Sequence, residues 1–282
     1  MLRLCFLGVV IQLVPMVLYA ESNVIAALQR DNTIRALKVG DEIITGDKIR
    51  TGANARVLIR LGEGSDVKLG EKTRWILREH PDASTNKIFS ALMVVVKGAF
   101  RFTTTKLSKN RKRKILARLN TATIGIRGTD VWGSVEEART FIVLIEGNIE
   151  IEENGQTTAM SDPLSLFSAS NNSPAEPLST INLNDLSGYA EQTELQVHKG
   201  VQSVGGRWQL NLASYREQEN VERLQGMLNK DGYRTFLERI TLNGKAYTRV
   251  VMTEFSTHQD ANFMRSQINT TYELTPWVSA TR

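Results

Sequence analysis

WQLNLASY (Trp208–Tyr215) and TRVVMTEF (Thr248–Phe255) are two short strand patterns, and each runs directly into an amphipathic helix pattern. Asn243-Gly244, between the two helices, is a strong signal for a two-residue hairpin. The segment ELTPWV then supplies a final strand. The order β-α-β-β-α-β predicts a ferredoxin-like α+β module over residues 207–282, with its first strand lying centrally beside the third and fourth.

Strand alternation sorts the side chains of this module onto two faces. Leu210 and Leu212 of the first strand, with Val250 and Met252 of the third, point toward the helices. The opposite, open face collects Gln209, Asn211, Ala213, Tyr247, Arg249, Val251 and Trp277. An indole stacks on the C–H surface of a sugar, while amide and guanidinium groups bind hydroxyl, acetamido or carboxylate groups. This face therefore suits a carbohydrate, and an ordinary solvated sheet face is the alternative.

The module resembles a SPOR (sporulation-related repeat) domain, a bacterial module that binds peptidoglycan glycan strands stripped of their stem peptides. The first family motif is aromatic-x-V-Q-x-G-S-F, and Trp208, Ser214 and Tyr215 match it. Asn211 replaces the glutamine of that motif, and Ala213 replaces its glycine. The resemblance covers nearly the whole module.

The second SPOR motif, R-V-x-x-G-P-F, is matched by Arg249, Val250 and Phe255, with Thr253-Glu254 in place of Gly-Pro. The resemblance implies that stripped glycan strands are the ligand, because removal of a stem peptide frees a lactyl carboxylate that Arg249 can bind. The implied glycan-binding residues are Gln209, Asn211, Ser214, Arg249, Val251 and Trp277.

Ser214 has two candidate roles. Its spacing from Glu217 forms an S-x-x-E capping box, which predicts that Ser214 caps the first helix of the module. The SPOR resemblance implies a ligand contact instead. We expect the cap and keep the ligand contact as the second role.

The first twenty residues read as a secretory signal peptide: a cationic start at Met1-Leu-Arg3, an apolar run from Leu4 to Leu18, and Ala20 before Glu21. The single cysteine of the chain, Cys5, lies inside this segment, so the mature protein would have no disulfide. We expect a periplasmic protein that is soluble after cleavage and has no further transmembrane segment. An uncleaved membrane anchor is the alternative.

Residues 23–152 predict a different domain. Short apolar runs are separated by glycine turns, and alternation is clear in Arg56–Leu61 and Phe141–Ile145. Strands at this spacing predict an all-β sandwich or roll. Three pieces resemble a FecR-type domain, and they are VGDEIITGDKIRTGANARVLIRLGEGSDVKL (Val39–Leu69), KGAFRF (Lys97–Phe102) and IGIRGTDVW (Ile124–Trp132). The FecR resemblance implies a fold and an envelope location, but not the signal relay of FecR, which needs a cytoplasmic arm and a spanning helix.

Two segments connect or interrupt these domains. Residues 153–206 are rich in Ser, Asn, Pro and Thr, which predicts a flexible linker with a short helix near residues 186–195. The run from Lys97 to Arg118 is basic and contains no acidic residue. We interpret it as a solvated loop, with contact to an anionic envelope polymer as the alternative. The signal peptide argues against nucleic acid, and no aromatic residue is interleaved among the basic residues from Lys106 to Arg118.

Catalytic motifs are missing from the sequence. His80, His198 and His258 are scattered, without a partner at metal-ligand spacing, and no known nucleophile or phosphate-binding motif occurs. We therefore expect no enzyme activity, no metal and no cofactor. The leading hypothesis is a non-enzymatic cell-envelope protein that binds glycan strands. The alternative is a regulatory or sensor protein, whose FecR-like domain binds another envelope protein while the C-terminal domain only localises it.

Overall fold

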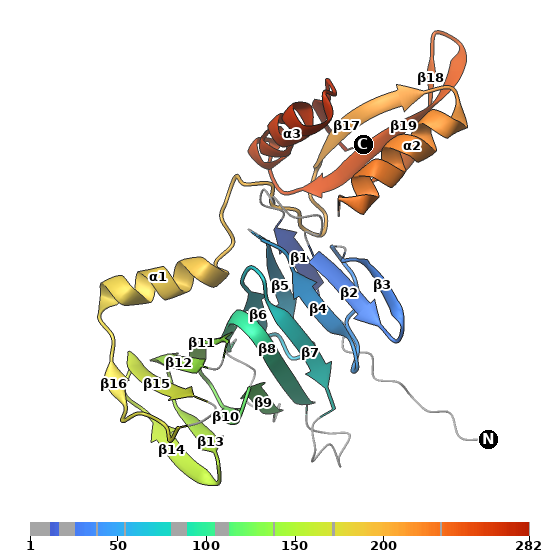
Figure 1. Cartoon of the computed structure of the whole chain (residues 1–282). Helices are drawn as coiled ribbons and strands as arrows, with labels where there is room; N and C mark the ends of the chain where they lie inside the picture. The colour runs from blue at the N-terminus through green and yellow to red at the C-terminus, as the bar shows by residue number, and fades with distance from the viewer. Residues whose placement is uncertain are drawn as a thin grey trace, which may run out of the picture.

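The computed structural model of the chain describes residues 12–16, 26–37, 39–53, 55–79, 89–104, 113–137, 139–170, 173–231 and 233–281. An N-terminal β body and a C-terminal α/β body are joined by a segment that contains helix α1 (Figure 1). The N-terminal strands are β1 (Gln12–Met16), β2 (Ala26–Arg30), β3 (Thr33–Ala36), β4 (Lys48–Thr51), β5 (Arg56–Arg60), β6 (Asp66–Leu69), β7 (Arg74–Arg78), β8 (Phe89–Thr103), β9 (Arg113–Leu119), β10 (Ala122–Ile126), β11 (Asp130–Glu136), β12 (Arg139–Glu146), β13 (Ile149–Glu153), β14 (Gln156–Met160), β15 (Ser165–Ser170) and β16 (Ser179–Thr180). After α1 (Leu183–Thr193) come β17 (Trp208–Tyr215), α2 (Gln218–Lys230), β18 (Phe236–Leu242), β19 (Lys245–Phe255), α3 (His258–Tyr272) and β20 (Trp277–Ala280).

Strand β8 belongs to two sheets and so folds the N-terminal body into a sandwich. Its first part pairs with β7 and β9, and its second part pairs with β6 and β11. The chain passes between the sheets at Gly98, where φ is +89° and an added Cβ would lie 2.3 Å from the Thr73 hydroxyl oxygen. Only glycine fits that position without strain. The predicted all-β sandwich is therefore confirmed.

The core of the sandwich follows the period-two pattern of its strands. Val57, Ile59 and Leu61 are buried, as the alternation in β5 predicted. Phe100 and Phe102 of β8 are fully buried in the same apolar cluster. These side chains belong to one buried apolar cluster that both sheets contribute to. Burial of apolar surface on this scale is the main force that holds the sandwich together.

The predicted linker, residues 153–206, differs from the structure in its first half. Strands β14, β15 and β16 continue the N-terminal sheets, and Phe167 of β15 is buried opposite Ile142 of β12. Polar residues are common in this segment at exposed positions and also at buried ones such as Ser165 and Ser168, so its composition does not reveal the strands. Helix α1 spans Leu183–Thr193, close to the helix expected near residues 186–195. The proposed domain limits themselves stay a prediction.

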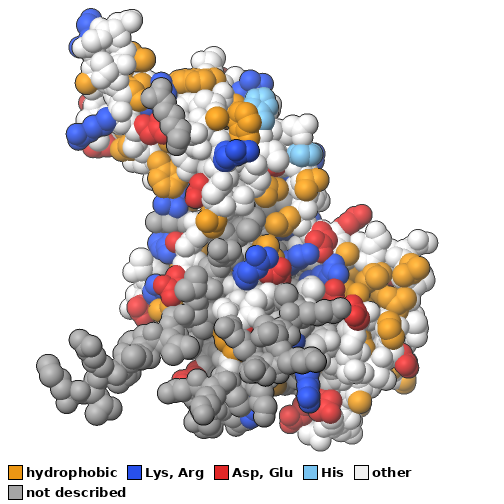
Figure 2. Space-filling model, turned by 180° about the vertical axis from the view of Figure 1, so that it is seen from behind, with side chains coloured by type: hydrophobic (Ala, Val, Ile, Leu, Met, Phe, Trp, Pro, Cys, Tyr) orange, Lys and Arg blue, Asp and Glu red, His pale blue; other side chains and the backbone are white. Residues whose placement is uncertain are grey.

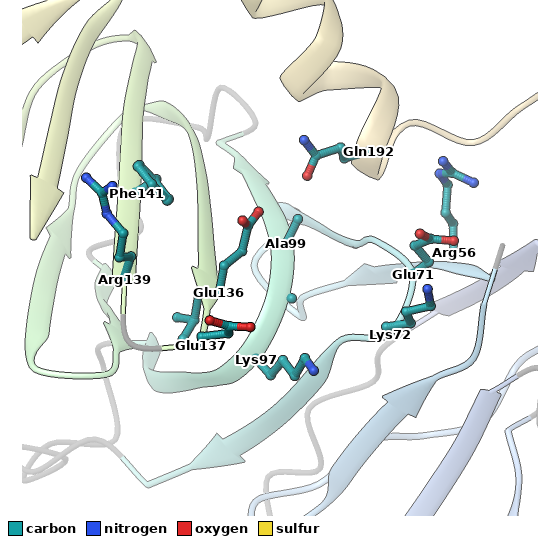
Figure 3. A pocket seen from close by; sticks show the side chains of 12 residues that line it. Arg56, Glu71, Lys72, Lys97, Ala99, Glu136, Glu137, Arg139, Phe141 and Gln192 are labelled. Carbon is teal, nitrogen blue, oxygen red and sulfur yellow. The ribbon is translucent and has the colours of Figure 1, made fainter. Parts of the chain in front are cut away.

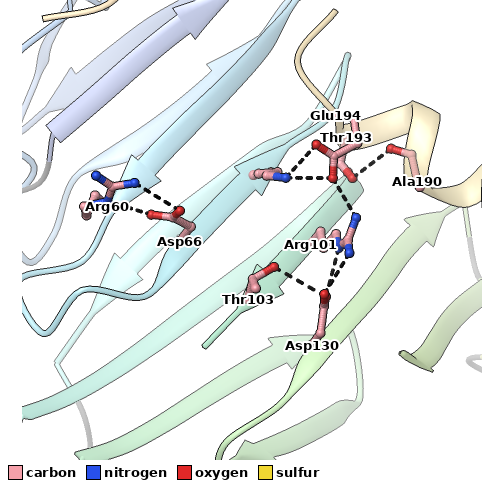
Figure 4. A network of polar contacts seen from close by, with 9 residues as sticks. Arg60, Asp66, Arg101, Thr103, Asp130, Ala190, Thr193 and Glu194 are labelled. Atoms are coloured by element: carbon pink, nitrogen blue, oxygen red, sulfur yellow. Dashed lines mark hydrogen bonds and ion pairs between the residues drawn. The ribbon is translucent and has the colours of Figure 1, made fainter. Parts of the chain in front are cut away.

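Helix α1 is fixed to the N-terminal body by an ion-pair network (Figure 4). Glu194, at its C-terminal end, accepts from Lys68 Nζ at 2.6 Å and from Arg101 at 2.6 Å. Arg101 also binds Asp130 through two nitrogens, at 2.7 and 2.8 Å. The ring of Tyr189 lies 4.5 Å from that of Trp132. The charged network and the aromatic contact hold this segment in place.

The C-terminal body has the predicted ferredoxin-like plan. Its sheet order is β18-β19-β17-β20, all pairs are antiparallel, and α2 and α3 cover one face (Figure 1). Leu210, Leu212, Val250 and Met252 point into a buried cluster with residues of both helices. The expected central position of the first strand, β17, beside β19 and β20 is confirmed.

A β-bulge in β17 changes one expected side-chain direction. Asn211 pairs with Val251 and Ala213 pairs with Val250, so Leu212 is an extra residue in the ladder. Both Leu212 and Ala213 therefore pack toward the helices, and the expectation that Ala213 lies on the open face is wrong. After the bulge, Ser214 returns to the open face.

The predicted capping role of Ser214 is also wrong. Helix α2 begins at Gln218, its N-cap is Glu217, and no side chain caps it. Ser214 is still part of β17, four residues before the helix, where its hydroxyl is out of reach of the free backbone N–H groups. Helix α3 is capped by Thr257, whose hydroxyl accepts from Asp260 N at 3.1 Å.

Two predictions fall largely outside the described residues. The predicted signal peptide, residues 1–20, is described only over Gln12–Met16, which form β1 against β5. The centre of the basic run, residues 105–112, is not among the described residues either. Over the ranges that the structure describes, no helix is long and apolar enough to cross a membrane.

Candidate functional site

One row of side chains crosses the open face of the C-terminal sheet. Backbone register places Phe236 of β18 beside Val251 of β19, Val251 beside Asn211 of β17, and Asn211 beside Trp277 of β20. Cross-strand partners share a face, so an aromatic ring lies at each end of this row. Trp277 is 42% exposed, whereas Asn211 and Val251 are fully buried. The middle of the row is therefore a floor, and its ends are the accessible parts.

Asn211 is the polar centre of this floor. Its Nδ2 donates to the Trp277 carbonyl oxygen at 3.1 Å and to Ser279 Oγ at 2.9 Å. Its Oδ1 accepts from Gln209 Nε2 at 3.0 Å and from Arg249 at 3.4 Å. An amide offers two donors and two lone pairs, so the Asn211 side chain has no capacity left for a ligand.

Arg249 covers this floor. Its guanidinium carbon lies 4.9 Å from the centroid of the Trp277 ring, a cation–π distance. Its Nε donates to Ser214 Oγ at 3.3 Å. Ser214 reaches Arg249 only because the bulge at Leu212 turns it onto the open face. Arg249 and Trp277 thus form a half-exposed pair of a flat ring and a cation, which we call the Arg249–Trp277 pair.

The structure brings the six predicted site residues together, but it gives them different roles. Arg249 and Trp277 are accessible, and Ser214 is half-buried beneath the guanidinium. Gln209, Asn211 and Val251 are buried, so they support the face rather than line its surface. Their roles in glycan binding stay a prediction.

Sequence reasoning missed several neighbours of the pair. Ser279 accepts from Asn211, and Glu238 lies 3.5 Å from Gln209 Nε2. At the other end of the row, the guanidinium carbon of Arg234 lies 4.2 Å from the centroid of the Phe236 ring. Alternation in the final strand could have found Ser279, which is two residues after Trp277. The two-residue turn at Asn243-Gly244 sets the register of β18 against β19, and that register could have found Phe236 and Glu238.

At the Phe236 end of the row, burial shifts the pKa values of two charged residues, Arg234 and Glu254. Burial lowers the pKa of Arg234, an effect that attraction by Asp41 of the N-terminal body and by Glu254 opposes. Burial also raises the pKa of Glu254, and attraction by Arg234 opposes that shift. Glu254, which stands at the proline position of the second SPOR motif, has φ +66°, in the region that favours glycine. This end is therefore a partly buried and strained contact near the N-terminal body.

The basic run of the N-terminal body is partly neutralised. Arg101 binds Asp130 and Glu194, and Arg113 lies 3.5 Å from Glu63. On the face shown in Figure 2, basic and acidic side chains are interspersed. Binding of an anionic polymer to this run stays a prediction.

Together these features define a two-part protein: a β-sandwich with an attached helix, followed by a ferredoxin-like module that presents an indole and a guanidinium on its open face. In comparisons with known families, the model for FecR protein matches residues 47–150 and the model for the SPOR domain matches residues 204–279. The chain therefore contains a FecR domain followed by a SPOR domain, in the predicted order. The SPOR domain suggests peptidoglycan binding, and both families have binding or regulatory roles.

No curated protein matches the chain. Among solved structures, two crystal structures of a protein from Parabacteroides distasonis ATCC 8503, assigned as an anti-sigma factor, are similar at a TM-score of 0.41 and 11% sequence identity. The similarity covers 80% of this chain and 92% or 91% of the other chain.

Proposed function

We propose that this chain is a non-enzymatic periplasmic protein of the cell envelope that binds peptidoglycan glycan strands lacking stem peptides through its SPOR domain. The observation that carries the proposal is the Arg249–Trp277 pair, with the ring and the cation 4.9 Å apart on the open face of the sheet. The periplasmic location rests on the signal-peptide pattern of residues 1–20.

The chemistry of the pair fits a stripped strand. The exposed indole of Trp277 offers an apolar plate for the C–H face of a sugar ring. Stem-peptide removal leaves the lactyl carboxylate of muramic acid free, and a guanidinium binds a carboxylate through charge-assisted hydrogen bonds. Asn211 and Ser214 hold Arg249 beside the indole, which reduces the ordering cost of binding.

A site of two accessible side chains should be weak. We expect a dissociation constant on the order of micromolar or poorer for one site. A glycan strand repeats the same disaccharide, so neighbouring sites on one polymer raise the residence time without new contacts.

Substitution of each member of the pair tests the proposal. Trp277→Ala and Arg249→Ala in the full chain should each weaken binding to purified stripped strands at least about tenfold, or about 1.4 kcal/mol. Arg239→Ala is the matched control, because Arg239 is exposed on β18 and lies on the other side of the sheet from Arg249. Unchanged binding by both pair variants would contradict the proposal.

A second candidate function is regulatory: the FecR domain binds another envelope component while the SPOR domain localises the chain. A pocket of the FecR domain beside α1 favours this candidate. A version of the chain with Trp277→Ala that is delocalised but still binds its FecR-domain partner would support it.

A further inference from the structure

A pocket lies between the C-terminal end of α1 and the N-terminal sandwich (Figure 3). It has a volume of about 710 Å³, within the range of small-molecule sites, roughly 300–1,000 Å³. We call it the α1 pocket. Gln192 of α1 borders one side, and Ala99 of β8 and Phe141 of β12 supply apolar surface. The remaining lining is mostly charged, so a charged ligand suits it better than an apolar one.

One side of the α1 pocket is rich in cations. Arg56 and Lys72 line it, together with Glu71, which attracts Arg56, and Lys97 of β8 lies between this side and β11. The Nε of Arg56 is buried without a hydrogen-bond partner in the part of the chain that the structure describes. A buried N–H without an acceptor is costly, so the charge of Arg56 is poorly compensated within the described fold.

The two lysines that line the pocket are not paired with a carboxylate in the described ranges. Neither Lys72 nor Lys97 forms an ion pair with any described residue. Burial lowers the pKa of Arg56, which means that nearby carboxylates do not fully compensate its charge. This side is therefore short of negative charge.

The opposite side of the pocket is acidic. Glu136 and Glu137 lie there, and within the described residues neither pairs with a cation. The neighbouring Arg139 does not neutralise them, since it binds Glu176 at 2.9 Å and stacks over Phe141 at 5.1 Å. Figure 3 shows Glu136 and Glu137 across the pocket from Arg56 and Lys72. Ala99 lies between the two charged sides, whereas Phe141 lies beyond Glu136 and Glu137, next to Arg139 (Figure 3).

The backbone holds two of these charged residues in an uncommon conformation. Lys72 has φ +51° and Glu137 has φ +48°. A left-handed conformation is unfavourable for a residue with a side chain. Such strain recurs at functional sites, where the surrounding fold enforces it. Both strained residues line the same pocket, one on each charged side.

We infer that the α1 pocket binds a short zwitterionic peptide, with its carboxylate toward Arg56, Lys72 and Lys97 and its ammonium group toward Glu136 and Glu137. The surface at Ala99 then accommodates a small side chain between the two charged ends. A stem peptide of peptidoglycan has this chemistry, and its choice as the first probe rests on the proposed function of the SPOR domain. An unrelated linear peptide of the same charges is the other source.

The test is isothermal titration of the full chain with two peptides. One is the stem tripeptide L-alanyl-γ-D-glutamyl-meso-diaminopimelate, and the other is the linear peptide Ala-Glu-Lys. We expect a dissociation constant of roughly 10 μM to 1 mM for the stem tripeptide. Binding of the stem tripeptide alone would assign the pocket to peptidoglycan peptides, and equal binding of both would assign it to zwitterionic peptides in general.

Paired substitutions locate the binding. Lys72→Gln with Lys97→Gln, and Glu136→Gln with Glu137→Gln, should each weaken binding about tenfold, because each removes one set of charge-assisted contacts. Lys245→Gln and Glu150→Gln are the matched controls on exposed strand positions away from the pocket. The inference is overturned if neither peptide binds at 10 mM, or if both double variants bind as the parent chain does. Trp277→Ala should leave peptide binding unchanged, so a failure of the glycan proposal is distinguishable from a failure here.

Discussion

The guanidinium of Arg249 lies 4.9 Å from the ring centroid of Trp277, and the same guanidinium donates to Ser214 Oγ at 3.3 Å. The position of the Arg249 guanidinium over the ring is thus fixed by hydrogen bonds to residues beneath it as well as by its attraction to the indole. Asn211 adds a second contact to Arg249 at 3.4 Å while holding the Trp277 backbone from the other side. Four residues on three strands therefore act as one unit, and substitutions beneath the pair should affect it.

Asn211→Ala tests the support beneath the pair. The substitution leaves Gln209 and the Trp277 carbonyl without their partner in a buried place, so we expect a loss of about 1–3 kcal/mol in the free energy of unfolding. Urea denaturation measures this loss. Asn229→Ala, at an exposed position of α2, is the control and should change stability by less than about 0.5 kcal/mol. Equal, small effects of the two substitutions would refute the role of Asn211 as a support.

Ser214→Ala and Thr257→Ala separate a ligand-face serine from a helix cap. Thr257 caps α3, so its loss should cost about 1 kcal/mol of stability. Ser214 caps no helix, so Ser214→Ala should cost less than this but weaken glycan binding severalfold by freeing Arg249. Thermal unfolding and binding to stripped strands measure the two effects. A larger stability loss for Ser214→Ala than for Thr257→Ala would favour the capping role that the sequence predicted.

Glu254 should make stability depend on pH. Burial raises its pKa above the ordinary value near 4.5, so the folded state holds the proton more tightly than the unfolded chain. The stabilisation from that proton is fully present below the unfolded pKa and is lost as pH rises through the raised folded pKa. Glu254→Gln should therefore be more stable than the parent chain at pH 7, and the difference should shrink toward pH 4. Melting temperatures across this range measure it, and a difference that grows toward acid would contradict the cause given.

The backbone of Glu254 supports a further prediction. Glu254 has φ +66°, so Glu254→Gly should relieve strain and stabilise the chain by about 1 kcal/mol. Glu273→Gly is a matched control, because Glu273 has φ +52° at the exposed C-terminal end of α3 and reports the gain from the backbone alone. Destabilisation by Glu254→Gly, with a gain for Glu273→Gly, would mean that the contact with Arg234 outweighs the strain.

Glu194→Gln should loosen α1. The carboxylate binds Lys68 and Arg101 together, and hydrogen bonds to charged groups contribute about 1.5–3 kcal/mol in favourable settings. We expect faster hydrogen exchange within Leu183–Thr193, with a larger effect at low salt. Glu191→Gln, with its exposed side chain, is the control. Protection of α1 that is unchanged in Glu194→Gln would show that Tyr189 and Trp132 suffice to hold the helix.

The sequence predicted the plan of both domains because the periodicity of their buried residues is strong. Leu210 and Leu212 against Val250 and Met252 were sufficient to orient the C-terminal sheet. The bulge at Leu212 could not be predicted, since it depends on pairing with β19 rather than on β17 alone. The role of Ser214 was therefore assigned to a helix that begins four residues later.

The sequence predicted which residues lie together on the open face, but not which of them are buried. Alternation placed Asn211 and Val251 on the open face, and both lie there, but it could not reveal that Arg249 and Trp277 would cover them. Exposure depends on how neighbouring strands bring long side chains together. For the same reason, the α1 pocket, which brings together residues from β5 to α1, left no local pattern in the sequence.

The most direct measurement is co-sedimentation of the full chain with peptidoglycan sacculi before and after amidase removal of the stem peptides. The Arg249–Trp277 pair predicts that amidase treatment increases binding several-fold and that Trp277→Ala abolishes the increase. Equal and negligible binding to treated and untreated sacculi would contradict glycan recognition by this domain.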